Sequence, residues 1–141
     1  MTAEKIINLI DSSPSGTRDL LLDELNDCIA AGDLGSMRPD DIVDKISALV
    51  PPHSNLAEQE SLFNVISSIY LGGECHERIE EIVLSRLFHL KASSLVHALE
   101  ILAASKLANK RELLRDFAKH ENEFIRKLAN SLLEQNGGGG L

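Results

Sequence analysis

Aromatic side chains are scarce in this chain of 141 residues, with one Tyr, no Trp and an aromatic content of 4%. Strands of β-sandwiches draw on aromatic and β-branched residues, so this scarcity disfavours an all-β fold. Leu, Ile, Val and Ala supply most of the 43% of residues that are hydrophobic, which favours interdigitated helices. A single domain of this size buries roughly 68% of the surface that its unfolded chain exposes.

A long hydrophobic run is also missing. The mostly apolar segment 6–10 is followed at once by Asp11, and no stretch approaches the roughly 20 apolar residues that a membrane span requires. Without a secretion signal, Cys28 and Cys75 are expected to be free thiols and not a disulfide. These features predict a cytoplasmic protein that does not engage a membrane.

Motifs for catalysis and metal binding are missing too. The sequence has no nucleophile motif, no phosphate-binding loop, and no HxxxH or HxH pair among its five histidines. Cys75 and His76 are adjacent, so on a helix they point about 100° apart and do not chelate. Glu77, Glu80 and Glu81 resemble a carboxylate cluster, but on a helix face such residues are normally solvated. We therefore predict no enzymatic activity, no metal site and no cofactor.

Charge is divided unequally along the chain. Residues 1–82 carry 16 acidic and 5 basic side chains, net −11, whereas residues 83–141 carry 6 acidic and 9 basic ones, net +3. Acidic side chains repel phosphates, so we expect no nucleic-acid partner for the N-terminal half. A strongly acidic half either binds a basic partner or serves only solubility.

Helical spacing of apolar residues recurs in eight segments, separated by Pro and Gly. Asn55 with Glu58, and Asn109 with Glu112, have the spacing of a capping box. Because the connections are short, the eight helices are expected to group as four antiparallel hairpins. The first three predicted helices lie near 3–11, 17–31 and 39–50, the fourth runs from Ser54 or Asn55 to 71, and the fifth lies near 75–90. The sixth starts after Ser93 or Ser94, the seventh at Asn109, and the eighth runs from near Asn122 to before Gly137.

A repeat is visible in the second helices of the last three hairpins. Leu62, Leu95 and Phe124 are spaced 33 and 29 residues apart, which is typical of a helical-repeat stack.

Residues 110–135 resemble one repeat of the HEAT family. A helix and a short acidic turn precede Ile125 and Arg126, and these are followed by a small residue, Ala129, and by Leu132. The match is weaker over the preceding hairpin, where a His stands at the Arg position. The resemblance implies a structural role for Arg126, which in this family often bonds an acidic turn residue of a neighbouring hairpin.

The fold class expected from the repeat and the resemblance is all-α. Four antiparallel hairpins would stack as a short HEAT-like α-solenoid over residues 1–136, with an irregular compact helical bundle as the alternative. The Gly-rich tail, 137–141, is predicted to be disordered.

Carboxylates recur on three of the predicted helices, and like charges four residues apart repel one another. In the segment 17–31 they lie opposite an apolar stripe formed by Leu21, Leu25, Cys28 and Ile29. The helix dipole favours carboxylates near a helix start but not those further along. The alternatives are a solvated surface and a face that binds a partner. The candidate binding carboxylates are Asp19, Asp23, Asp27, Asp40, Asp41, Asp44, Glu77 and Glu81.

Two apolar residues, Leu84 and Phe88, share the side of the segment 75–90 that carries Glu77 and Glu81. We expect this side to be a second buried face that packs against a neighbouring hairpin. The alternative is an apolar anchor ringed by acids, which is the usual composition of an interaction hot spot. Phe88 is therefore also a candidate partner-binding residue.

The chain resembles, in general form, the small, acidic, helical immunity proteins that neutralise nuclease toxins in bacteria; the likeness is one of type and not of residues. It implies a binding-only inhibitor, monomeric when free, whose acidic face covers the active site of a basic toxin. The alternative is a HEAT-like scaffold or adaptor module that binds proteins on its concave side. A third, more distant alternative is nucleic-acid binding through Arg111, Arg115 and Lys119.

Overall fold

Regular structure in this chain is helical. The computed structural model describes residues 1–138, and within them there are eight α-helices, one short 3-10 helix and no strand, which confirms the all-α prediction. The last helix includes residues 137 and 138 of the predicted tail, whereas 139–141 lie outside the described residues. The elements are α1 (Ala3–Ser12), α2 (Asp19–Ala30), α3 (Pro39–Leu49), α4 (Leu56–Leu71), α5 (His76–Arg86), η1 (Leu87–His89), α6 (Ala92–Ala104), α7 (Lys110–Phe117) and α8 (Glu123–Gly138).

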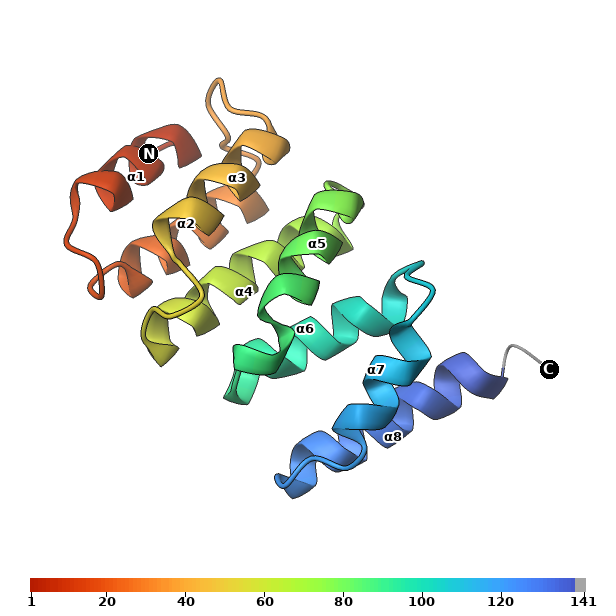
Figure 1. The fold of residues 1–141 in the computed structure, drawn as a ribbon. Coiled ribbons are helices and arrows are strands. Elements are labelled where there is room, and N and C mark those ends of the chain that lie inside the picture. The colour runs from red at the N-terminus through yellow and green to blue at the C-terminus, as the bar shows by residue number, and fades with distance from the viewer. Residues whose placement is uncertain (139–141) are drawn as a thin grey trace.

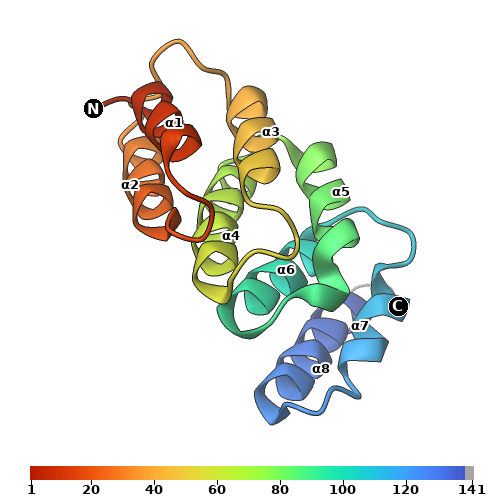
Figure 2. The same ribbon diagram turned by 60° about the vertical axis from the view of Figure 1, so that its left-hand side comes forward.

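The helices lie in two layers (Figure 1, Figure 2). α2, α4, α6 and α8 follow one another side by side, and each contacts the next. α1, α3, α5 and α7 lie along one side of that layer, and each contacts the even-numbered helix that follows it. α1 and α8 are therefore at opposite ends of the molecule (Figure 1).

α4 is the central helix of the core. It contacts α2 and α6 within its own layer and α3 and α5 in the other layer. Leu62, Phe63, Val65 and Ile66 of α4 are fully enclosed. A helix that packs on more than one side has apolar residues around much of its circumference, and this distribution places α4 at the centre of the stack.

In α2, the buried residues differ from the predicted apolar stripe. Leu22 and Leu25 are fully buried, whereas Leu21, Cys28 and Ile29 are half-buried. The reason is that α2 packs against both α1 and α4, so two neighbours set its buried face.

Local hydrogen bonds explain where several helices begin. The Asn55 side chain accepts a bond from the Glu58 amide (2.8 Å), so Asn55 caps α4 as predicted. Glu58 does not complete the capping box, because its carboxylate accepts from the backbone amide of Arg18 (2.9 Å) and ties α4 to the start of α2. Asn109 makes no side-chain cap, contrary to prediction, since its backbone (φ −97°, ψ 12°) is not in the extended conformation that capping favours.

Two other predicted boundaries are wrong. The segment 75–90 is not one α-helix, because the chain leaves α5 as the 3-10 helix η1. α6 begins at Ala92, before the predicted start after Ser93 or Ser94. The Ser94 hydroxyl does not cap the helix; it donates to the Lys91 carbonyl (2.6 Å) from within the first turn.

Two arginines hold the C-terminal end of α3. The guanidinium of Arg86, which is 5% exposed, donates to the carbonyl oxygens of Ser47 (2.8 Å) and Val50 (2.6 Å) and to Oε1 of Gln59 (3.3 Å). Burial lowers the pKa of Arg86. Arg18 donates to the carbonyl of the last residue of α3 (2.7 Å). Because the last turn of a helix leaves its carbonyls without partners, these bonds fix α3 against α5 and α2.

Candidate functional site

Four of the predicted binding carboxylates come together where α3 meets α5. Asp40 and Asp44 lie one turn apart on α3, and Glu77 and Glu81 lie one turn apart on α5. All four are exposed, and they line a hollow of about 500 Å³ between the two helices, which we call the acidic groove. Its lining residues are Asp40, Asp44, Cys75, His76, Glu77, Arg78 and Glu81.

Arg78 supplies the single guanidinium of the acidic groove. Its Nε donates to Asp44 Oδ1 (2.7 Å) and its Nη1 to Glu81 Oε2 (3.3 Å), so it bridges α3 and α5. The bond to Asp44 raises the pKa of Arg78. The side chains of Arg78, Asp44 and Glu81 are 47%, 58% and 69% exposed, and such exposed ion pairs contribute about 1 kcal/mol or less. A basic residue of a partner could therefore replace Arg78 with little loss of free energy.

Asp40 is held by a thiol. The Sγ–H of Cys75 donates to Asp40 Oδ1 (2.8 Å). Burial, followed by the bond to Asp40, raises the pKa of the Cys75 thiol to about 12. The thiol therefore stays protonated near neutral pH and orients Asp40; it is not an activated nucleophile. Cys75 and Cys28 are both free, as predicted.

Glu80, the third member of the glutamate cluster on α5, has a structural partner. It accepts a hydrogen bond from the Tyr70 hydroxyl (2.7 Å), and burial, with a smaller effect of this bond, raises the pKa of Tyr70. The Tyr70 ring stacks on His76 with 4.3 Å between ring centroids. These contacts fasten the start of α5 to α4 and so set the position of Glu77 and Glu81.

Asp41 lies on a different surface of α3. It lines a hollow of about 450 Å³ between α1 and α3, together with Glu4, Asp44 and Lys45. The Glu4 carboxylate accepts from the hydroxyl and the amide of Ser36, and the hydroxyl bond lowers its pKa most. Each hollow has one basic residue, but three carboxylates line this one and four line the acidic groove, so this surface is the less acidic of the two.

The three aspartates of α2 are apart from the acidic groove. α2 belongs to the layer of even-numbered helices, whereas α3 and α5 belong to the other layer (Figure 2). Asp19 is half-buried, and Asp23 and Asp27 are exposed. The candidate carboxylates are therefore divided among the acidic groove, the hollow between α1 and α3 that holds Asp41, and the surface of α2.

Phe88 and Leu84 are not buried, so the expectation of a second buried face is wrong. Phe88 is 63% exposed and Leu84 is 36% exposed. Because the chain turns into η1 after α5, the Phe88 ring stacks on Phe117, with 5.3 Å between ring centroids. Phe88 and Phe124, which is 65% exposed, line a groove of about 730 Å³ that we call the aromatic groove.

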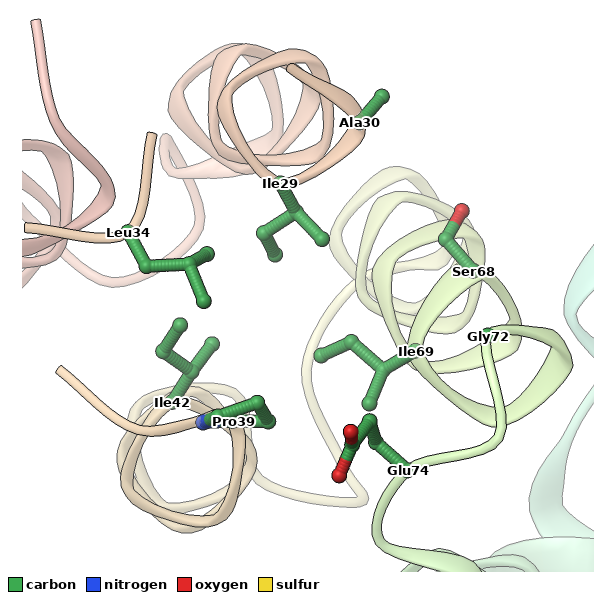
Figure 3. A pocket seen from close by; sticks show the side chains of 9 residues that line it. All are labelled: Ile29, Ala30, Leu34, Pro39, Ile42, Ser68, Ile69, Gly72 and Glu74. Carbon is green, nitrogen blue, oxygen red and sulfur yellow. The ribbon is translucent and has the colours of Figure 1, made fainter. Parts of the chain in front are cut away.

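Sequence reasoning missed a further hollow, of about 490 Å³, where α2, α3 and α4 meet. In Figure 3 the side chains of Ile29, Leu34, Ile42 and Ile69 point into it, and Glu74 lies at its edge. We call it the apolar hollow. Its walls come from separate segments, so no local pattern reveals it. The one available signal was an apolar residue, Leu34, in the glycine-containing loop before α3.

Possible metal ligands, membrane-spanning helices and similarity to known proteins give no further indication of function. Among residues 1–138, no group of three or more His, Cys, Asp and Glu side chains is arranged to hold a metal ion. No helix in that part of the chain is both long and apolar enough to cross a bilayer. Comparison with protein-family models, with curated proteins and with solved structures finds no match to this chain.

Proposed function

We propose that this protein is a binding-only inhibitor: an immunity protein that neutralises a basic toxin, such as a nuclease, by covering its active site. The acidic groove carries the proposal, because four carboxylates line it against a single guanidinium. A nuclease surface is basic where it binds phosphates, so carboxylates compete for the same positions. The carboxylates act by contact and charge, and the proposal assigns neither a reaction nor a cofactor to this chain.

The charge of the whole N-terminal half supports the same proposal. Residues 1–82, which include both sides of the acidic groove, carry a net charge of −11. Charge at the rim of an interface speeds association, while desolvated carboxylates paired with Lys or Arg slow dissociation. Arg78, held between Asp44 and Glu81, indicates where a guanidinium of the partner would bind.

We also propose that the two layers form a short HEAT-like stack of four hairpins, cytoplasmic and monomeric when free. The contacts between consecutive even-numbered helices, and between each odd helix and the next even one, support this arrangement. Arg126, at the arginine position of the family, donates to the carbonyl oxygens of His120 and Glu121 in its own turn (3.0 Å each). It therefore stabilises the turn itself and not a neighbouring hairpin.

If a large secreted protein with a variable C-terminal domain is encoded directly upstream of this chain, that domain is the partner to test. The double variant Asp40→Lys/Glu77→Lys reverses charge in the acidic groove, and Asp23→Lys/Asp27→Lys reverses the same amount of charge on α2. At low salt we expect the groove variant to associate about tenfold or more slowly and to lose protection against the toxin. The α2 variant should slow association less, since it alters only the long-range electrostatic attraction between the two proteins.

Two results would contradict the proposal. One is an association rate that does not respond to salt or to the groove variant. The other is an equal loss of protection in the groove variant and the α2 variant, because the acidic groove would then have no special part in binding. Circular dichroism of both variants shows whether each keeps its helical content.

A scaffold or adaptor module is the second candidate, and the aromatic groove favours it. Phe88 and Phe124 present large exposed rings there, and Lys91 and Glu121 are the only formally charged residues among those that line it. A largely apolar groove suits a peptide that binds through apolar side chains. Phe124→Ser should then abolish binding that is nearly independent of salt, whereas it should leave the binding of a basic toxin unchanged.

A further inference from the structure

The apolar hollow and the acidic groove are neighbouring parts of one surface. Asp40 lines the acidic groove and directly follows Pro39, which lines the apolar hollow. Cys75 lines the acidic groove and directly follows Glu74, which lines the apolar hollow. The hydrogen bond from Cys75 to Asp40 (2.8 Å) joins the two segments at this boundary.

The apolar hollow has a buried floor and half-buried walls. Ile42 and Ile69 are 1% and 5% exposed, whereas Ile29, Leu34 and Pro39 are half-buried. Figure 3 shows the isoleucines and Leu34 directed toward the same central space. Its volume of about 490 Å³ is within the range of sites that enclose a ligand or an inserted side chain. Covering these half-buried walls with apolar atoms removes apolar surface from water, which is favourable.

The surroundings of the apolar hollow are acidic. Glu74 lines it, and Asp33 and Asp40 directly adjoin lining residues in the sequence. Arg38 is the one basic residue that adjoins a lining residue. A neutral apolar molecule gains nothing from these carboxylates, and an acidic partner is repelled. An apolar side chain flanked by Lys or Arg complements both the walls and the rim.

We infer that the apolar hollow takes one aliphatic or aromatic side chain of the basic partner, while Lys or Arg residues beside it contact Glu74 and Asp40. The inference rests on the proposed function and adds the chemistry of the partner: an exposed apolar residue within a basic surface. In protein interfaces a buried anchor of this kind carries much of the affinity, and the charges around it set specificity and association rate.

The test compares two synthetic peptides, both rich in Lys and Arg, that differ only in a central Leu or Ser. Their affinities are measured by NMR titration of the full chain. Leu34→Trp fills the apolar hollow, because Leu34 points into it (Figure 3). Leu20→Trp is the matched control, since Leu20 is 73% exposed and lies at the other end of α2. The chain has no other Trp, so the emission of the introduced tryptophan reports whether its ring is enclosed, and the melting temperature reports the fold.

The wild-type chain is expected to bind the Leu peptide about tenfold more tightly than the Ser peptide. Leu34→Trp should abolish that difference, and Leu20→Trp should preserve it. If the wild-type chain binds both peptides equally and the groove variant Asp40→Lys/Glu77→Lys weakens both, the inference fails and the proposed function stands. If neither peptide binds at low salt, the proposed function fails as well.

Two further outcomes would identify a different occupant and overturn the inference. One is equally tight binding of a neutral peptide with the same central Leu, which would mean that the carboxylates play no part. The other is a dimer that forms with rising protein concentration and is lost in Leu34→Trp, which would mean that a second copy of the chain covers the apolar hollow.

Discussion

The junction between α3 and α5 is built differently from the attachment of the last two helices. At the first junction, the buried guanidinium of Arg86 bonds the end of α3 and a side chain of α4. α7 and α8 also contact α6, and Leu114 and Ile125 are buried there. One hydrogen-bonded link joins α7 to α6: the half-buried Lys110 donates to the carbonyl oxygens of Ala103 (3.1 Å) and Ser105 (2.8 Å) at the end of α6. Hydrogen bonds are directional whereas apolar packing is not. The acidic groove therefore lies beside a buried guanidinium with three acceptors, whereas the aromatic groove lies where apolar packing and one half-buried ammonium join the helices.

Among the substitutions that test this comparison, Arg86→Met should lower the free energy of unfolding most. The substitution keeps much of the volume but leaves the carbonyls of Ser47 and Val50 and the amide oxygen of Gln59 without their donor. We expect the free energy of unfolding in urea to fall by about 3 kcal/mol. Arg126→Met, which removes two bonds from a partly exposed turn, should cost about 1 kcal/mol. Equal losses at the two positions would contradict the comparison.

The second prediction concerns the thiol in the acidic groove. With its pKa raised to about 12, Cys75 should be alkylated slowly by iodoacetamide at neutral pH, and its rate should keep rising well above pH 9.0, the ordinary pKa of the group. Asp40→Ala removes both the acceptor and its negative charge but not the burial, so the rate should increase about tenfold. Mass spectrometry in a Cys28→Ser background measures the alkylation rate of Cys75. An unchanged rate would mean that the hydrogen bond to Asp40 does not raise the pKa of the thiol.

The same shift gives a pH dependence of stability. The folded chain binds the proton of Cys75 more tightly than the unfolded chain does, because the folded pKa is the higher one. The stabilisation is therefore complete below about pH 9 and is lost as the pH rises toward 12. Urea unfolding of Cys75→Ser and of the wild-type chain across this range should show a smaller decline in the variant.

Phe88→Ala, in the aromatic groove, should lower the free energy of unfolding only slightly. The ring is 63% exposed and loses mainly its stacking with Phe117, so the free energy of unfolding should fall by about 1 kcal/mol. The affinity for basic peptides should not change, because Phe88 lies outside the acidic groove. A loss above about 3 kcal/mol, which is typical of an enclosed aromatic ring, would restore the buried-face expectation.

Asp23→Lys/Asp27→Lys should have the smallest effect on stability. Both side chains are exposed on α2. The new lysines at positions 23 and 27 repel each other as the aspartates did, but each gains an opposite charge three or four residues away, Asp19 and Glu24 respectively. We expect a gain of a few tenths of a kcal/mol in urea unfolding. A loss above about 1 kcal/mol would show that these aspartates stabilise the fold, and the separation between the α2 carboxylates and the acidic groove would then need revision.

Helix ends were predicted correctly where neighbouring residues in the sequence, such as a capping side chain or a glycine, determine them. Asn55 caps α4 as its spacing with Glu58 indicates, and Gly72 follows the last residue of that helix. The predicted capping box and the predicted end of α5 were wrong, because contacts between distant parts of the chain determine both. The Glu58 carboxylate bonds Arg18 across the structure, and α5 ends where Arg86 is drawn into hydrogen bonds with α3. Sequence spacing does not reveal such partners.

The candidate site was predictable one helix at a time. The spacing of Asp40 with Asp44, and of Glu77 with Glu81, placed each pair on one helical face. Which faces meet depends on the packing of the layers, so the sequence could not separate the α2 carboxylates from the acidic groove. The apolar hollow was not predictable for the same reason, since α2, α3, α4 and a loop each contribute only part of its wall.

The central claim is that the acidic groove binds a basic partner. The most direct measurement is an NMR titration of the wild-type chain with a Lys- and Arg-rich peptide at low salt, repeated at high salt. The claim predicts amide shifts concentrated around residues 40–44 and 74–81 that disappear as salt screens the charges. Shifts centred on α2 or on the aromatic groove, or shifts that persist at high salt, would contradict it.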